Sequence, residues 1–153
     1  MKDKLLLLKD LHNACKENVQ KRLATIQSQL SSIEESKNND TKSSAGDKYE
    51  TGRAMMQIEE DKMKRQLFET NLVSQELGQI DVEEKSSKVI LGSLVTTNKG
   101  EYYLSIGIGK ITVNEQLFYC LSISSPIGAK MLNKEVGDKI NFNGSEIKIL
   151  EIN

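Results

Sequence analysis

The sequence has no long apolar run. The longest near its start, residues 5–8 (LLLL), is closed by Lys9 and Asp10, whereas a membrane-spanning helix needs roughly 18 or more apolar residues. Because Lys9 and Asp10 follow the run directly and no signal-peptide cleavage site precedes them, the run does not have the pattern of a secretion signal. We therefore expect a soluble protein that is not exported and has no membrane partner.

The sequence also has few cysteines and little net charge. Its two cysteines, Cys15 and Cys120, stand 105 positions apart. This spacing suggests no disulfide framework, and a reducing cytoplasm is the simplest location. The formal net charge of -1 argues against a general nucleic-acid coat, because binding to phosphates needs a clustered excess of Lys and Arg.

Several reactive or charged residues have a structural interpretation. His12 and Cys15 have the spacing of helical metal ligands, but no second pair completes a site, which favours packing in a helix seam. Cys120 lies in an apolar strand pattern and is interpreted as a buried structural thiol. The charge run 59–62 (EEDK) is interpreted as a solvated helix face.

The composition changes near Glu84. Residues 1–84 carry 13 basic and 16 acidic residues, three glycines and two aromatics. Residues 85–153 carry 8 basic and 6 acidic residues, seven glycines and five aromatics. The first part is typical of helix and the second of β structure. We predict an α+β protein with domains 1–84 and 85–153.

Apolar residues in the first part follow the steps of three and four that are typical of a coiled-coil seam. The first seam consists of Leu5, Leu8, His12, Cys15, Val19, Leu23, Ile26, Leu30 and Ile33. A looser second seam consists of Met56, Met63, Leu67, Val73, Leu77 and Ile80. The polar segment 36–44 between them is predicted to be a turn, and the second helix to end near Gly78. Neither helix has a broad apolar face, so we predict an antiparallel hairpin and leave its self-association open.

The second part predicts a small antiparallel sheet with one short helix. The strands are expected at 88–97, 101–108, 110–113, 117–124, 139–142 and 146–152, because these segments are rich in β-branched and aromatic residues. Pro126 is expected to start a helix that reaches about Asn133. Asn143 and Gly144 are a strong signal for a hairpin turn between the last two strands.

Two acids follow the predicted helical turn. Asp47 and Glu50 are three positions apart, which places both carboxylates on one face if the second helix starts near Asp47. Acids at a helix start are commonly explained by capping and by the helix dipole. They are also suitable ligands for Mg²⁺, which is commonly held by one or two carboxylates and keeps several waters. Spacing alone leaves both interpretations open.

Two motifs resemble the bacterial transcript-cleavage elongation factors of the Gre type. Residues 124–138 (SSPIGAKMLNKEVGD) are similar to the SPI-x-x-x-L-x-G-K-x-x-G-D stretch of that family's FKBP-like C-terminal domain. Residues 46–50 (GDKYE) resemble the G-D-x-x-E tip of the family's coiled coil. Together the resemblance covers nearly the whole chain.

The resemblance implies a cytoplasmic transcription elongation factor that binds RNA polymerase. The hairpin would enter the secondary channel while the FKBP-like domain grips the channel rim, and the partner-binding residues would be Ser125, Pro126, Ile127 and Gly128. In the family the two tip acids help to hold the second catalytic Mg²⁺ and its water, which stimulates hydrolysis of backtracked RNA by the polymerase. Asp47 and Glu50 are the matching positions.

The same resemblance implies that the polymerase is the enzyme and that this chain catalyses nothing alone. Mg²⁺ would be bound only within the polymerase complex, and the free protein would need no cofactor. The nascent RNA 3′ end would be an indirect partner, and DNA binding is implied in the same way.

The motifs also depart from the family at several positions. The segment Thr51-Gly52-Arg53-Ala54 stands where N-A-E-Y usually follows the tip glutamate, and Asn133 stands where Gly is common. These departures leave open a channel-binding regulator that does not stimulate cleavage. A stand-alone enzyme, either a peptidyl-prolyl isomerase by fold analogy or a thiol enzyme through Cys120, has no acid/base pair in residues 85–153 to support it.

Overall fold

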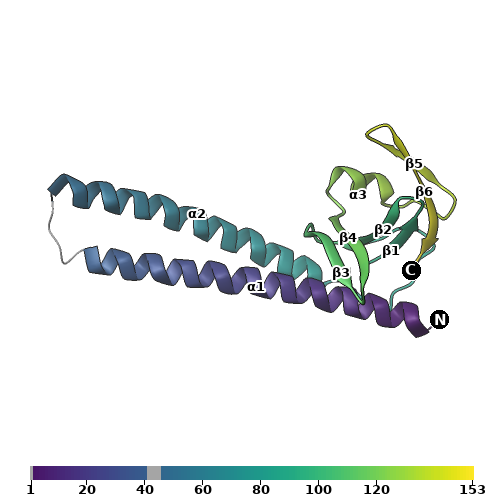
Figure 1. Cartoon of the computed structure of the whole chain (residues 1–153), viewed down its shortest axis with the longest axis horizontal. Coiled ribbons are helices and arrows are strands. Elements are labelled where there is room, and N and C mark those ends of the chain that lie inside the picture. Colours follow the sequence, from purple (N-terminus) through teal and green to yellow (C-terminus); the bar gives the residue numbers. More distant parts are fainter. Residues whose placement is uncertain (1, 41–45) are drawn as a thin grey trace. The chain divides into compact units, whose positions relative to one another are not determined.

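The computed structural model describes residues 2–40 and 46–153 of the chain (Figure 1). Two long helices come first, α1 (Lys2–Asp40) and α2 (Gly46–Gly78). The remaining elements are β1 (Leu94–Thr97), β2 (Gly100–Ser105), β3 (Gly109–Val113), β4 (Gln116–Ser122), α3 (Pro126–Met131), β5 (Lys139–Phe142) and β6 (Ser145–Ile152). The predicted α+β class is confirmed.

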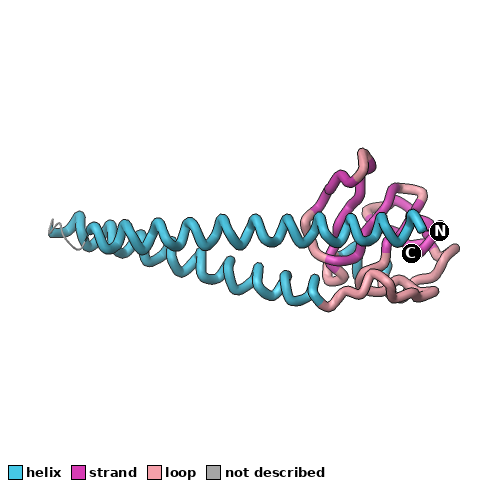
Figure 2. Tube along the Cα trace, turned by 90° about the horizontal axis from the view of Figure 1, so that it is seen from below, coloured by secondary structure: helices cyan, strands magenta, loops and turns pink. Residues whose placement is uncertain are grey.

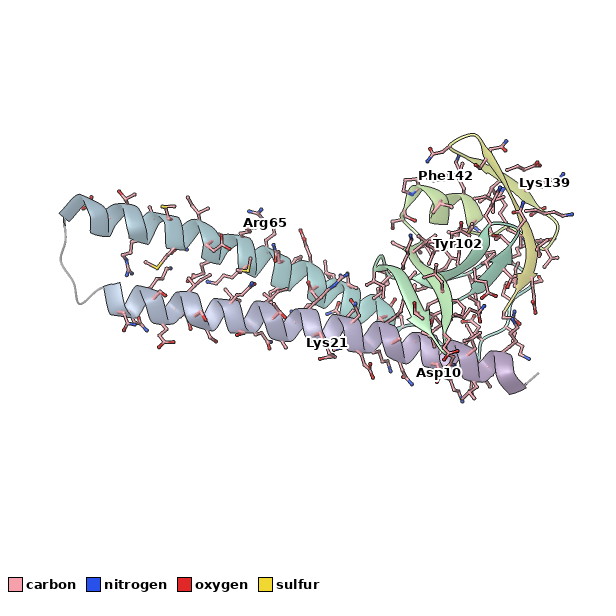
Figure 3. The ribbon with its side chains drawn as sticks, viewed as in Figure 1. Asp10, Lys21, Arg65, Tyr102, Lys139 and Phe142 are labelled. Atoms are coloured by element: carbon pink, nitrogen blue, oxygen red, sulfur yellow. The ribbon has the colours of Figure 1, made fainter. Side chains whose placement is uncertain are left out.

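The helices α1 and α2 form the predicted hairpin (Figure 2). The predicted turn 36–44 is wrong for residues 36–40, which belong to α1, and residues 41–45 lie outside the described part of the chain. Residues 19–74 make one compact unit, in which each helix turns one face toward the other. The outer faces carry charge: Lys21 on α1 and Arg65 on α2 are exposed and point away from the opposite helix (Figure 3). The inner side chains of α1 are Leu23, Ile26, Leu30, Ile33 and Lys37, and those of α2 are Met56, Glu60, Met63, Leu67 and Thr70.

A second compact unit contains residues 2–18 and 75–153. Its six-stranded sheet has the order β3-β4-β2-β1-β6-β5. The prediction of an antiparallel sheet is wrong for one pair, because β2 and β4 are parallel, with Tyr102 opposite Tyr119. The strand β3 pairs antiparallel with β4, so the chain reverses twice before β4 lies beside β2.

Most predicted strands agree with the structure within a few residues, and the turn before β6 is as expected. Asn143 and Gly144 have φ of 52° and 79°, the left-handed conformation that a two-residue hairpin turn requires. The predicted strand 88–97 is wrong in its first half, since β1 begins only at Leu94. Gly92 has a φ of 94°, and this left-handed backbone interrupts an extended strand.

Both faces of the sheet are covered. Side chains alternate between the faces of a strand, so Leu104 of β2 joins a core cluster with Met131 of α3 on one face. Tyr103 and Ser105 turn to the other face, where Ser105 contacts Cys15 of α1. The first part of the α1 seam was expected to pack against the second helix, and the structure shows that it contacts the sheet. At the β3–β4 turn, Asn114 Nδ2 donates a hydrogen bond of 3.2 Å to Asp10 of α1 (Figure 3).

The compact units divide the chain differently from its composition. The boundary predicted after Glu84 follows the change from helix to sheet. The compact units instead group residues 2–18 and the end of α2 with the sheet, because these segments pack there. Domains 1–84 and 85–153 stay a prediction.

Among the described residues, none of the helices is both long and apolar enough to cross a membrane.

Candidate functional site

The tip acids lie where α2 begins. The helix starts at Gly46, so the backbones of Asp47 and Glu50 both belong to its first turns, as the sequence predicted. The Glu50 side chain is exposed. The side chain of Asp47 and residues 41–45 lie outside the described part of the chain. The structure therefore supports the helical placement of the pair and describes one of its two carboxylates.

The residue Arg53, one turn beyond Glu50, contacts the opposite helix. Its Nη1 donates a hydrogen bond of 3.2 Å to the main-chain carbonyl of Lys37. The Lys37 ammonium donates in turn to Gln57 Oε1 at 2.6 Å. A residue that departs from the family's motif thus holds α1 and α2 together close to the end of the hairpin.

An ion pair lies inside the hairpin seam. The Glu60 carboxylate is 2.9 Å from the Lys37 ammonium and 3.0 Å from that of Lys64, and 11% of its side chain is exposed. Hydrogen bonds from Lys37 and then from Lys64 lower the pKa of the Glu60 carboxyl. The interpretation of residues 59–62 as a solvated face is therefore wrong for Glu60. The sequence feature that could have revealed this is the position of Glu60, four residues after Met56 and three before Met63, which is an inward position of a heptad.

The C-terminal motif builds the start of α3. The Ser125 hydroxyl donates to the Ser122 carbonyl at 2.6 Å and accepts from the Gly128 N–H at 3.1 Å, which is the hydrogen bonding of an N-cap. Gly128 is buried, Ile127 packs against the core cluster and Pro126 is exposed. Three of the four expected partner-binding residues thus have a structural role, and Pro126 is the one that faces solvent.

The residue Asn133 follows the C-cap of α3 and explains one departure from the family's motif. Its φ is 67°, a left-handed conformation that Gly adopts freely and that Asn tolerates better than most residues. Its N–H donates to the Val89 carbonyl at 2.9 Å. Asn can therefore replace Gly here without changing the backbone.

The structure brings together two cysteines that the sequence places far apart. Both are fully buried, as expected of structural thiols. Cys15 Sγ lies 3.8 Å from Cys120 Sγ and 3.7 Å from Ser105 Oγ. The hydrogen bond with Cys120 lowers the pKa of Cys15 and outweighs burial, which alone would raise it. The same contact, followed by burial, raises the pKa of Cys120.

The histidine His12 lies in the α1 seam, as predicted. It is 8% exposed, and burial, followed by the charge of Lys16, lowers its pKa. Within the described ranges, no three His, Cys, Asp or Glu side chains are placed to hold a metal ion. The helical spacing of His12 and Cys15 therefore does not form part of such a site there.

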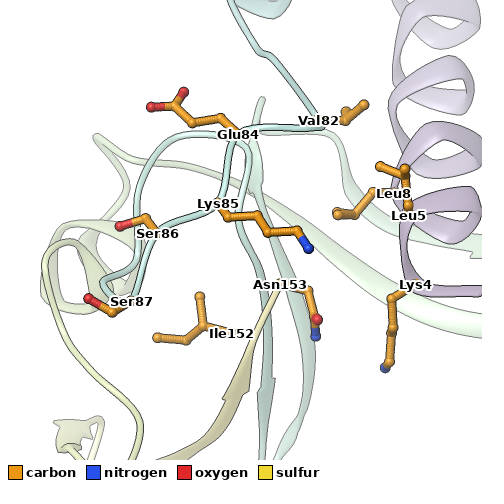
Figure 4. A pocket seen from close by; sticks show the side chains of 10 residues that line it. All are labelled: Lys4, Leu5, Leu8, Val82, Glu84, Lys85, Ser86, Ser87, Ile152 and Asn153. Carbon is orange, nitrogen blue, oxygen red and sulfur yellow. The ribbon is translucent and has the colours of Figure 1, made fainter. Parts of the chain in front are cut away.

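A pocket of about 360 Å³ lies between the start of α1, the segment after α2 and the end of β6 (Figure 4). The Lys85 side chain extends into it (Figure 4). Its lining mixes apolar with charged and hydroxyl side chains: Lys4, Leu5, Leu8, Val82, Glu84, Lys85, Ser86, Ser87, Ile152 and Asn153. The pocket contains none of the residues that the sequence analysis proposed for function.

Comparison with known proteins identifies no family directly. No model of a protein family matches the chain, and no curated protein matches it. Among solved structures, the chain is similar to one described as the structure of the transcription factor Gfh1, with 19% identity, a TM-score of 0.37, and coverage of 90% of this chain and 92% of that one. No conclusion about function rests on this likeness. The order of a helical hairpin and then a sheet with one short helix is the order that the sequence resemblance predicts.

Proposed function

We propose that this protein is an RNA polymerase-binding elongation factor of the Gre type, which stimulates the polymerase to cleave backtracked RNA. The observation that carries the proposal is the position of Asp47 and Glu50 in the first turns of α2, directly after the chain reverses between the two helices. A hairpin that enters the secondary channel of the polymerase would present these acids first. The motif of residues 124–138 in the second part of the chain supports the same family.

The two acids suit a metal site that is completed by a partner. Carboxylates three apart in a helix lie on one face, and Mg²⁺ commonly takes one or two carboxylates and keeps waters in its other positions. Asp47 and Glu50 would hold the ion only when the hairpin is in the polymerase. The ion supplies an activated water and stabilises charge on the phosphate oxygens. This chain contributes ligands and their orientation, and the hydrolysis belongs to the polymerase.

The sheet-containing unit supplies the second part of the proposed interface. Ser125 and Gly128 fix the start of α3, and Pro126 is exposed on its first turn. We assign the segment 125–128 to the contact with the channel rim. Ser125 and Gly128 would act by holding Pro126 in place, and the 3′ end of the nascent RNA would be met only through the polymerase.

One observation favours a second candidate, a channel-binding regulator without cleavage activity. Arg53 lies three residues after Glu50, and its guanidinium is held near the end of the hairpin by the Lys37 carbonyl. A cation where the family usually has an acid would make the tip less attractive to a metal ion. Such a regulator would bind the polymerase and displace a true cleavage factor.

A transcript-cleavage assay on a stalled, backtracked complex distinguishes the two candidates. The Asp47→Ala/Glu50→Ala double variant should lose stimulated cleavage by about 100-fold or more, the scale of removing a group that stabilises charge in the transition state. Its binding to the polymerase should be unchanged. Glu59→Ala is the matched control, because Glu59 is an exposed acid of the same helix outside the tip.

The outcomes separate clearly. Cleavage that persists in the double variant would contradict the proposed role of the acids. If the wild-type protein binds the polymerase, does not stimulate transcript cleavage and competes with a cleavage factor, the second candidate is correct. In that case we expect Arg53→Ala to gain some stimulation of cleavage.

A further inference from the structure

The cysteine pair is not used by the proposed function. Cys15 belongs to α1 and Cys120 to the middle of β4, yet their sulfur atoms are 3.8 Å apart. Both residues lie in the same compact unit. The contact therefore joins the first part of α1 to the sheet.

The surroundings hold the two thiols against each other. Both side chains are 0% exposed, and so is Ser105, which contacts Cys15 from the strand next to β4. A side chain packed at native density has few other rotamers available. The sulfur atoms consequently stay in contact, whereas in an unfolded chain the same residues would meet rarely because 105 positions separate them.

We propose that Cys15 and Cys120 are a site of reversible disulfide formation, oxidised by a low-molecular-weight disulfide of the glutathione class. A disulfide needs a sulfur–sulfur distance of about 2.05 Å, so the two atoms must approach from van der Waals contact by small torsional changes within their present rotamers. The bond would fasten α1 to β4 without joining two molecules.

The reaction takes two exchange steps. The Cys15 thiolate attacks one sulfur of glutathione disulfide, which forms a mixed disulfide and releases one glutathione thiolate. Cys120 loses its proton and attacks the Cys15 sulfur of the mixed disulfide, which forms the Cys15–Cys120 bond and releases the second glutathione. Two protein thiols are oxidised, and one glutathione disulfide is reduced to two glutathione molecules.

The electrostatics of the closed unit support Cys15 as the first nucleophile in any opening that keeps the two sulfur atoms in contact. The contact that lowers the pKa of Cys15 raises that of Cys120, and the thiolate is the reactive form of cysteine. Since both thiols are buried, the reagent reaches them only when the unit opens locally. We therefore expect slow oxidation, and a disulfide that is protected from reductants once the unit closes.

The test is an equilibrium measurement on the full chain in glutathione redox buffers. The fraction of intramolecular disulfide, determined by acid quenching, alkylation and mass spectrometry, gives the effective concentration of one thiol relative to the other. We expect this effective concentration to be about 100-fold or more higher in native buffer than in concentrated urea, the scale on which a disulfide in a long loop stabilises a fold. A native value equal to or below the denatured value would overturn the proposal.

The single variants Cys15→Ser and Cys120→Ser are the controls, and each should form no intramolecular disulfide. In the oxidised wild type, the sheet-containing unit should also have a thermal unfolding midpoint about 5–15 °C higher than in the reduced protein. The Cys15→Ser/Cys120→Ser variant should show no such shift with the same buffers. Oxidation that yields only mixed disulfides or linked dimers would also contradict the site.

Discussion

Two residues at the start of α3 show how a short motif can be explained by local geometry. Ser125 caps the helix, and Gly128 lies so close to the chain before it that a Cβ would come within 2.1 Å of the Ser122 carbonyl oxygen. A side chain therefore cannot be added at Gly128 unless the backbone of the cap moves.

The variant Gly128→Ala should consequently destabilise the protein by about 1–3 kcal/mol, the usual cost of overpacking. Ser125→Ala should cost about 1–2 kcal/mol, since it removes the cap and the hydrogen bond to the Ser122 carbonyl. Urea unfolding followed by circular dichroism measures both. Gly107→Ala is the matched control, because Gly107 has open space around it. Equal stability of the Gly128 and Gly107 variants would contradict the packing argument.

Single residues differ in how far their sequence context predicts them. The Asn143–Gly144 turn was predicted because its conformation is decided by two adjacent residues. Asn133 and Gly92 also have positive φ, but nothing in their immediate neighbours required it. The approach of Cys15 to Cys120 depends on how α1 packs against β4, which no local pattern contains.

At the scale of elements, the hairpin seam holds a charged group at an inward position. Glu60 is paired with Lys37 of the opposite helix at 2.9 Å. If one helix shifted along the other, Glu60 and Lys37 would separate and leave a buried charge without a partner. Such a pair can therefore favour one register of a coiled coil.

The pH dependence of the hairpin should follow from this pair. The folded-state pKa of Glu60 is lowered, so its stabilising contribution is present above the ordinary glutamate value of about 4.3 and is lost as pH falls through the lower folded value. The unfolding midpoint of the hairpin unit should therefore fall more steeply below pH ~4.3 in the wild type than in Glu60→Gln. Glu60→Gln should also be less stable than the wild type at neutral pH by a few degrees, since Lys37 loses its charged partner.

Thermal unfolding monitored at a series of pH values measures both effects. Glu59→Gln is the control, because Glu59 is exposed on the same helix. Parallel pH profiles of the Glu60→Gln variant and the wild type would show that the pair contributes nothing to acid unfolding.

The sheet shows a limit of prediction at the same scale. The strands were found from their composition, but their partners depend on the whole chain path. The neighbours β3 and β4 pair as a hairpin, which is the local solution. The parallel pairing of β2 with β4 joins strands that are not consecutive, so the antiparallel expectation was wrong there.

At the scale of the whole molecule, the chain forms two compact units that share both long helices. Residues 19–74 form one, and residues 2–18 and 75–153 form the other. Each unit has buried apolar side chains of its own, with Met63 in the first and Leu11 in the second.

Two units with separate cores should not unfold in a single transition. Leu11→Ala should lower the free energy of unfolding of the sheet-containing unit, and Met63→Ala that of the hairpin unit. Each change should be about 2–5 kcal/mol, as is usual when a large buried side chain is replaced by Ala, and should lower the transition temperature of that unit. Differential scanning calorimetry of both variants measures this. Leu6→Ala is the control for Leu11, because Leu6 is 60% exposed on the same helix. One transition that both core variants shift equally would show that the units unfold together.

The sequence by itself determined the order and type of the elements, the hairpin, the short helix that starts at Pro126 and the tight turn before β6. It also determined that Asp47 and Glu50 follow the chain reversal, because helix and turn signals are local in the chain. Only the tertiary structure decided which faces meet: the α1 seam against the sheet, β2 beside β4, Glu60 inside the hairpin and Cys15 against Cys120. These contacts join residues far apart in sequence, and packing of the whole chain, rather than local propensity, selects them.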